Sequence, residues 1–276
     1  MPTTNTSPFD TAFEELLNNF SHLHVLRKII TSSFERDKYM RDESRKNSAN
    51  EFSSMHNMTY RDITSNQVIF FDHKELSRDD LDAYTKVMLN HQYQWIFINA
   101  FECFEKFIEK CHVNVASRSD TPIKGTNNLS KKLQYLRLHV PELSKNETIN
   151  YRSINYRSTI ALIEQLRHIM THNGGKVKDI KKFRAGLDDK IQAHNNGNHD
   201  KDISSFIKIF LPEQQDGKEI NLLRIYYSEM QYIDPLDDAM GCLLTYSSQL
   251  KDLSNIWLDR NDTQHSQSQS QSQSAH

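Results

Sequence analysis

The chain has 276 residues, of which only 7 are Gly and 6 are Pro. These 13 turn-forming residues are about 5% of the chain, against about 12% in average usage. Sandwiches, barrels and propellers need a turn roughly every 8–12 residues, so the composition argues against them. It also leaves no Gly-rich phosphate loop of the dinucleotide-binding or P-loop type. Helices with long connections are the expected class.

Charge is nearly balanced, since 34 Lys and Arg face 36 Asp and Glu for a net charge of −2. This excludes the global basic field of a non-specific nucleic-acid coat protein, although a local patch is compatible with it. Three cysteines are too few for a disulfide framework. The first residues do not form the apolar run of a secretory signal, and no stretch approaches 18 apolar residues. We therefore expect a cytoplasmic protein without membrane spans.

Apolar residues at helical spacing predict helices at about 8–36, 81–111, 129–138, 151–172 and 234–258. Ser7 and Pro8 are typical of a helix start. The strongest signal lies in 81–111, where one apolar stripe contains Phe97, Phe101, Phe104, Ile108 and Cys111. Adjacent Gly174 and Gly175 follow the fourth helix, and a left-handed glycine commonly ends a helix.

The polar stretch 37–67 is expected to be a linker, a lid or a disordered insertion, and 68–71 a strand or docking segment. Loops are expected at 121–128 and 195–198, a small hairpin at 206–211 with 220–225, and a disordered Ser-Gln tail at 264–275. The predicted organisation is an N-terminal helix with a polar insertion (1–80), a helical domain (81–260) and a tail (261–276).

Two clusters at the helix predicted for 81–111 are candidate chemical sites. Cys103, Cys111 and His112 do not have metal-ligand spacing, and the apolar stripe already explains both cysteines. No metal or cofactor is therefore expected. Glu102 and Glu105 share a flank of the helix, where they fit acid/base chemistry or, more simply, a solvated edge or an ion partner for an arginine.

Arg167 and His172 form an R-x4-H pattern near the end of the fourth helix. The spacing alone is weak, because chance predicts about two such pairs and a second occurs at Arg260 and His265. Context favours the first, because apolar residues lie between its two ends and Arg167 projects from the apolar side of its helix. A buried guanidinium must be paired or functional, since an unpaired buried charge is very costly.

Helical geometry sets a condition on this pair. Five residues of ideal helix separate Arg167 and His172 by about 140° and 7.5 Å, so both reach one small group only if the helix ends near His172. The glycines at 174 and 175 are a stop signal at that place. Alternatively, two copies of the motif line one cleft across a dimer.

The residues around this motif resemble a known family. Residues 166–174 (LRHIMTHNG) look like the signature of HEPN domains, and residues 95–105 (WIFINAFECFE) resemble the helix that packs against it there. The resemblance covers roughly 81–258 and is strongest at 93–111 and 155–175. His168 occupies a position where the family typically has another polar residue, often Asn.

The resemblance implies a four-helix up-and-down bundle that dimerises and places two R-x4-H motifs in a shared cleft. Many such proteins are metal-independent endoribonucleases, often toxins or effectors of anti-phage defence, so the implied partners are RNA, a second copy, and an antitoxin or defence-system protein. In this chain His172 would act as acid/base, Arg167 as phosphate ligand, and His168 as a positioning or second proton-transfer group. Asn173 is a candidate for substrate binding.

A structural alternative explains the same residues without catalysis. In it, Arg167 pairs with Glu102 or Glu105, and His172 caps its own helix end, where the helix dipole favours a histidine. Members of the family that have lost activity serve as binding modules, so an antitoxin-like or adaptor module is the alternative function.

Overall fold

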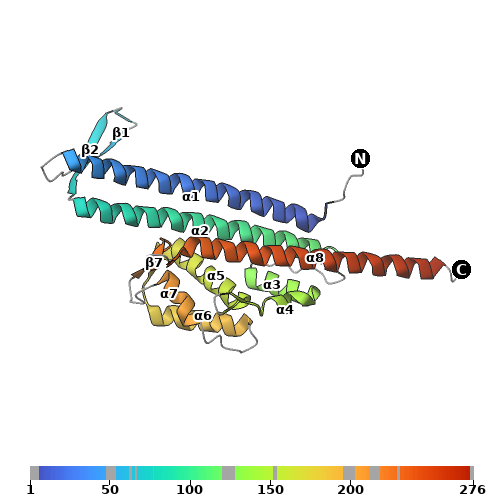
Figure 1. The fold of residues 1–276 in the computed structure, drawn as a ribbon. Helices are drawn as coiled ribbons and strands as arrows, with labels where there is room; N and C mark the ends of the chain where they lie inside the picture. Colours follow the sequence, from blue (N-terminus) through green and yellow to red (C-terminus); the bar gives the residue numbers. More distant parts are fainter. Residues whose placement is uncertain are drawn as a thin grey trace. The chain divides into compact units, whose positions relative to one another are not determined.

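The computed structural model describes residues 6–47, 54–61, 64–65, 67–76, 78–119, 128–151, 154–194, 203–211, 218–228 and 231–273. The described chain is mainly helical, as expected, with four short two-stranded sheets (Figure 1). It forms two compact units. The first combines Met1–His24 with Gln94–His276, and the second is Val25–Tyr93, so the boundary expected at residue 80 falls inside the second unit.

Two long helices each contribute to both units: α1 (Pro8–Asn47) and α2 (Arg78–Ala116). Within the second unit, the hairpin β1 (Ser54–Arg61) and β2 (Val68–Leu76) pairs antiparallel with a register shift at Met58/Thr59. Residues 68–71 thus form a strand, which is one of the two alternatives expected for them.

The irregular insertion predicted at 37–67 is wrong over the described residues, because α1 continues to Asn47 and β1 follows. The residues after Asp37 are polar but include Glu, Lys and Arg, which are good helix formers. Arg41 also pairs with Asp37 one turn earlier and, at 3.2 Å, with Asp82 of α2. Polarity alone therefore does not end this helix.

The first unit contains the remaining elements. Its helices are α3 (Leu129–His139), α4 (Pro141–Asn146), α5 (Tyr156–Asn173), α6 (Ile180–His194), α7 (Ile203–Phe210) and α8 (Pro235–Gln273). Its strands form the antiparallel pairs β3 (Asn150–Tyr151) with β4 (Ile154–Asn155), β5 (Lys176–Val177) with β6 (Lys218–Glu219), and β7 (Ile225–Ser228) with β8 (Gln231–Ile233).

The stripe predicted on α2 forms the centre of the first unit's core. Phe101, Phe104, Ile108 and Cys111 are each 0% exposed. Phe104 packs edge-on against Tyr246 of α8 with 5.9 Å between ring centroids, and Tyr246 also meets Tyr156 of α5. Helix α5 contacts both α6 and α8 (Figure 1). The core thus joins α2, α5 and α8.

Three boundaries differ from expectation. Helix α5 begins at Tyr156 rather than 151, because the β3–β4 pair precedes it and Asn155 caps it by accepting from Ser158 N at 2.9 Å. The predicted hairpin at 206–225 is wrong, since Ile203–Phe210 is helical. Short apolar runs do not distinguish strand from helix by periodicity. Helix α8 extends to Gln273 and includes most of the Ser-Gln repeat, so the disorder predicted for 264–275 is wrong as far as Gln273.

Several other expectations can be compared directly. Helix α3 ends at His139, near the predicted stop, and Pro141 then opens α4. The loop predicted at 195–198 and all but the last residue of the loop predicted at 121–128 lie outside the described residues; that last residue, Asn128, caps α3. None of the described helices has an apolar stretch of the length that a bilayer requires.

Candidate site at the end of helix α5

Helix α5 has one buried face, and its C-terminal turn carries exposed side chains. Ile160, Ile163, Leu166 and Met170 are at most 4% exposed, whereas His168, His172 and Asn173 are exposed. Gly174 follows with φ +57° and ψ +37°, and its N–H donates to the carbonyl of Ile169. The predicted left-handed stop is confirmed.

The second glycine, Gly175, is held by a residue that sequence reasoning missed. It has φ +77°, and a Cβ there would lie 2.5 Å from the side-chain amide of Gln94 on α2. Gln94 is 5% exposed and donates from Nε2 to Glu219 Oε1 and to the carbonyl of Ile220, both at 2.9 Å. Ile220 N in turn donates to the Gly175 carbonyl at 2.8 Å. One buried amide therefore fixes the turn after α5.

Arg167 lies at the border between the two faces of α5. Its Nη2 is 3.7 Å from Glu105 Oε2 and 3.9 Å from Glu102 Oε1, and its guanidinium lies over the Phe101 ring at 5.9 Å. The arginine side chain is 26% exposed and the two glutamates 48% and 34%. Arg167 therefore meets the acids that the structural alternative named, through long and partly solvated contacts.

The electrostatics of this contact are finely balanced. Partial burial raises the pKa of Glu105, and the positive charge of Arg167 opposes that rise. The Nε of Arg167 is buried and has no hydrogen-bond partner within the described part of the chain. The guanidinium thus keeps donor capacity that the two carboxylates do not use.

His168 and His172 are one helical turn apart and form an exposed imidazole pair. Their ring centroids are 4.6 Å apart, with 53° between the ring planes. Loss of hydration lowers the pKa of His168, and the positive charges of His172, Lys190 and Arg167 lower it further. His168 is therefore held in its neutral form near pH 7, and a neutral imidazole can accept a proton.

The stop at Gly174 does not release His172 from helical geometry. Helix α5 extends through Asn173, and Thr171 Oγ1 still donates to the Arg167 carbonyl at 2.9 Å. Arg167 and His172 therefore remain about 140° apart around the helix axis. The prediction that the helix end lets Arg167 and His172 of one chain reach one small group is therefore wrong. The alternative, a cleft lined by the motifs of two copies, stays a prediction.

The other candidate residues are placed as follows. Asn173 is exposed and is the last residue of α5, with Gly174 in the capping position. In the second R-x4-H pattern, Arg260 forms an ion pair with Glu142 of α4 and is 62% exposed. Arg260 is thus a surface residue with an ordinary partner.

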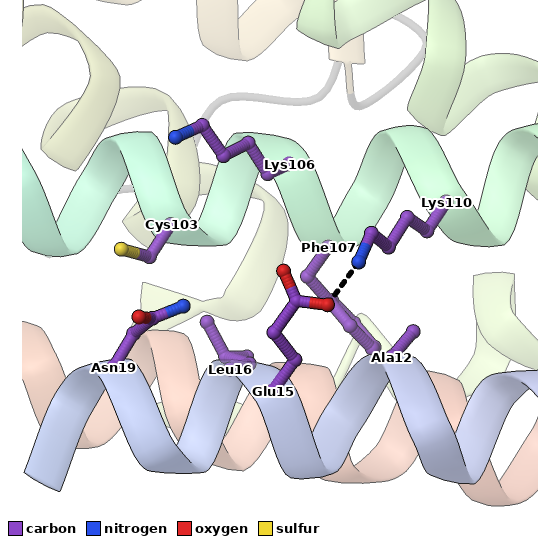
Figure 2. A pocket seen from close by; sticks show the side chains of 8 residues that line it. All are labelled: Ala12, Glu15, Leu16, Asn19, Cys103, Lys106, Phe107 and Lys110. Carbon is purple, nitrogen blue, oxygen red and sulfur yellow. Dashed lines mark hydrogen bonds and ion pairs between the residues drawn. The ribbon is translucent and has the colours of Figure 1, made fainter.

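A small pocket lies beside Cys103 of α2. Figure 2 shows it between α1 and α2, with Cys103, Phe107, Leu16 and Asn19 in its wall and the Glu15–Lys110 ion pair across it. Its volume of about 10 Å³ is room for one water molecule at most. No group of three metal-ligating side chains occurs among the described residues.

A buried ionic cluster elsewhere in the first unit also went unpredicted. Glu147 is 1% exposed and accepts from Arg137 Nε at 2.7 Å, from Arg157 Nε at 2.6 Å and from the Tyr246 hydroxyl at 2.6 Å. Arg157 also donates to Ser144 Oγ at 2.9 Å. The cluster joins α3, α5 and α8, and no local pattern around these residues indicates it.

Comparison with known proteins supplies no further guide, because no family model, curated protein or solved structure matches the chain.

Proposed function

We propose that this protein is a metal-independent endoribonuclease of HEPN type, with the end of α5 as its site. The observation that carries the proposal is the exposed His168–His172 pair, one turn long, beside the partly exposed Arg167. Two proton-transfer groups and a fixed cation are what RNA cleavage by its own 2′-hydroxyl requires.

In the proposed reaction, the neutral imidazole of His168 takes the proton of a 2′-hydroxyl, and the 2′-oxygen attacks the adjacent phosphorus. The bond from phosphorus to the 5′-oxygen breaks, and the leaving oxygen receives a proton from His172. Arg167 binds the phosphate and offsets the charge of the pentacoordinate transition state. The products are a 2′,3′-cyclic phosphate and a 5′-hydroxyl.

The angle between Arg167 and His172 supports a site made by two copies. Since the two side chains leave α5 about 140° apart, one chain does not direct both to one phosphate. Two chains packed with their α5 ends together bring the arginine of one copy toward the histidine of the other. A HEPN-like four-helix bundle is the fold we propose for the part of the first unit that includes α2, α5 and α8. Action as a toxin or anti-phage effector rests on the family resemblance alone.

One observation favours the alternative, a non-catalytic binding or dimerisation module such as an antitoxin or adaptor. Arg167 has two acidic partners within 4 Å, so an ion pair accounts for its position without a substrate. The two functions differ in whether Arg167 is needed for activity or only for structure.

The test is incubation of the purified protein with total RNA in EDTA, beside Arg167→Ala and His172→Ala variants. Arg260→Ala is a matched control, since it removes the arginine of the second R-x4-H pattern. We expect cleavage by wild type and Arg260→Ala only, with 2′,3′-cyclic phosphate ends. Equal inactivity of all four proteins on varied RNAs would favour the binding module, and equal activity of all four would reject this site.

A further inference from the structure

The segment directly after the proposed site has a strong local charge. Residues 176–184 (KVKDIKKFR) contain five basic residues and one acid, a net charge of +4 in a chain whose total is −2. The exposed members are Lys176, Lys178, Lys181 and Lys182, which we call the basic turn. Within the described part of the chain, no ion pair involves any of these four lysines.

The local structure directs the basic turn outward. Val177 of β5 is 2% exposed, whereas Lys176 before it and Lys178 after the strand are both exposed. On α6, Phe183 is 4% exposed, and Lys181 and Lys182 lie off its buried side. Asp179, the one acid, accepts from Lys182 N at 2.8 Å and so caps the start of α6.

The basic turn is fixed next to the imidazole pair. Only three residues lie between His172 and Lys176, and the Gln94 contact holds the intervening turn against β6. Helix α6 then packs along α5, where Lys190 meets Glu164 at 3.2 Å and its charge acts on His168. The four lysines therefore extend the positive charge of the proposed site along the chain.

We propose that the basic turn binds the phosphate backbone of single-stranded RNA and guides the strand to the histidine pair, an inference that rests on the proposed function. The one aromatic residue in the segment, Phe183, is buried, so the basic turn itself offers no exposed ring for base stacking. Contacts made by lysine charge alone position the strand without reading its sequence. The basic turn thus selects a polyanionic strand and leaves sequence preference to other parts of the protein.

Salt dependence tests this directly. The full-length His172→Ala chain is titrated with a fluorescent single-stranded 20-mer RNA from 50 to 300 mM KCl, and the slope of log K against log salt is measured. Each lost phosphate contact reduces the slope by about 0.7 for a single strand, so changing all four lysines to Gln should reduce it by about 2 to 3. The matched control changes Lys28, Lys86, Lys131 and Lys145, which are also exposed, and should retain the slope.

The outcomes separate the two proposals. Equal slopes for the two quadruple variants, both folded by circular dichroism, would overturn the role of the basic turn even if wild type cleaves RNA. A reduced slope in the basic-turn variant alone supports it, even if wild type cleaves nothing and the proposed activity fails. Loss of binding to anionic phospholipid vesicles with unchanged RNA binding would assign the turn to a membrane surface and overturn the inference.

Discussion

Arg157 and Arg167 lie ten residues apart on α5, and their contacts predict opposite consequences when each is changed to Gln. Arg157 is 15% exposed, and its Nε meets the 1% exposed Glu147 at 2.6 Å. Arg157→Gln leaves the buried Glu147 with Arg137 and Tyr246 as its remaining partners, and loss of one hydrogen bond to a charged group costs about 1.5–3 kcal/mol. Arg157→Gln should therefore destabilise the first unit strongly.

Arg167→Gln removes weaker contacts. Its ion pairs are 3.7 and 3.9 Å long between partly exposed groups, and such pairs contribute about 0–1 kcal/mol. The contact with the Phe101 ring at 5.9 Å adds about 0.5–1 kcal/mol. The expected loss is thus about 1 kcal/mol, which is smaller than the loss expected for Arg157→Gln.

Urea unfolding followed by circular dichroism measures both losses, and the RNA assay is run on the same preparations. We expect Arg167→Gln to remain folded and to lose cleavage. If Arg167→Gln destabilises the protein as much as Arg157→Gln, Arg167 is a structural ion partner and the reasoning that places it at a catalytic site is refuted.

Three further predictions concern the surroundings of the site and the core. Gly175→Ala should lower stability by more than the about 1–2 kcal/mol that a left-handed residue costs, since its Cβ would lie 2.5 Å from the Gln94 side chain. Gln94→Ala should restore part of this loss in a double-mutant cycle, and strictly additive losses would contradict the contact. Lys190→Gln removes a positive neighbour and should raise the pKa of His168 in an NMR titration, so the acidic limb of the pH profile of cleavage should move to higher pH. An unchanged titration would show that the charge of Lys190 does not act on His168. Burial, and after it the charge of Lys132, lowers the pKa of His112, so the unfolded chain binds a proton there more readily than the folded chain. Stability should therefore fall as the pH drops below about 6.5. The urea midpoint should be lower at pH 5.5 than at pH 7.5, and His112→Gln should reduce that difference.

The helical framework could be predicted because its causes are local. The spacing of Phe101, Phe104 and Ile108 shows which face of α2 is buried, and all three are 0% exposed. The stop after α5 is equally local, because Gly174 needs only its own backbone freedom to take φ +57°. These features follow from residues within one or two turns of each other.

The parts that failed depend on contacts between distant residues. Gln94 fixes a turn 81 residues later, and Tyr246 donates to a carboxylate 99 residues away. Nothing in the pattern around Glu147 distinguishes it from a surface glutamate. The apolar run that includes Phe210 predicts a strand but forms helix α7, because a short buried run fits both periods and only its packing distinguishes them.

The candidate site itself combines both kinds of feature. Its residue types and the helix end are visible in the sequence, whereas the angle between Arg167 and His172 depends on whether the last turn stays helical. It does stay helical, and this carries a consequence for assembly. If catalysis occurs, the arginine and the histidine at one phosphate come from different chains.

Mixed dimers test that consequence. Arg167→Ala and His172→Ala chains carrying different tags are co-expressed, and dimers that contain one of each are purified by both tags. A two-fold dimer has two equivalent sites, so the mixed dimer keeps one arginine–histidine combination and should show about half of the wild-type rate. Each variant alone should be inactive, and dimers of a tagged wild type control for the tags. An inactive mixed dimer, or an active wild type that light scattering shows to be a monomer, would contradict a shared site, because the 140° angle then has to be overcome within one chain.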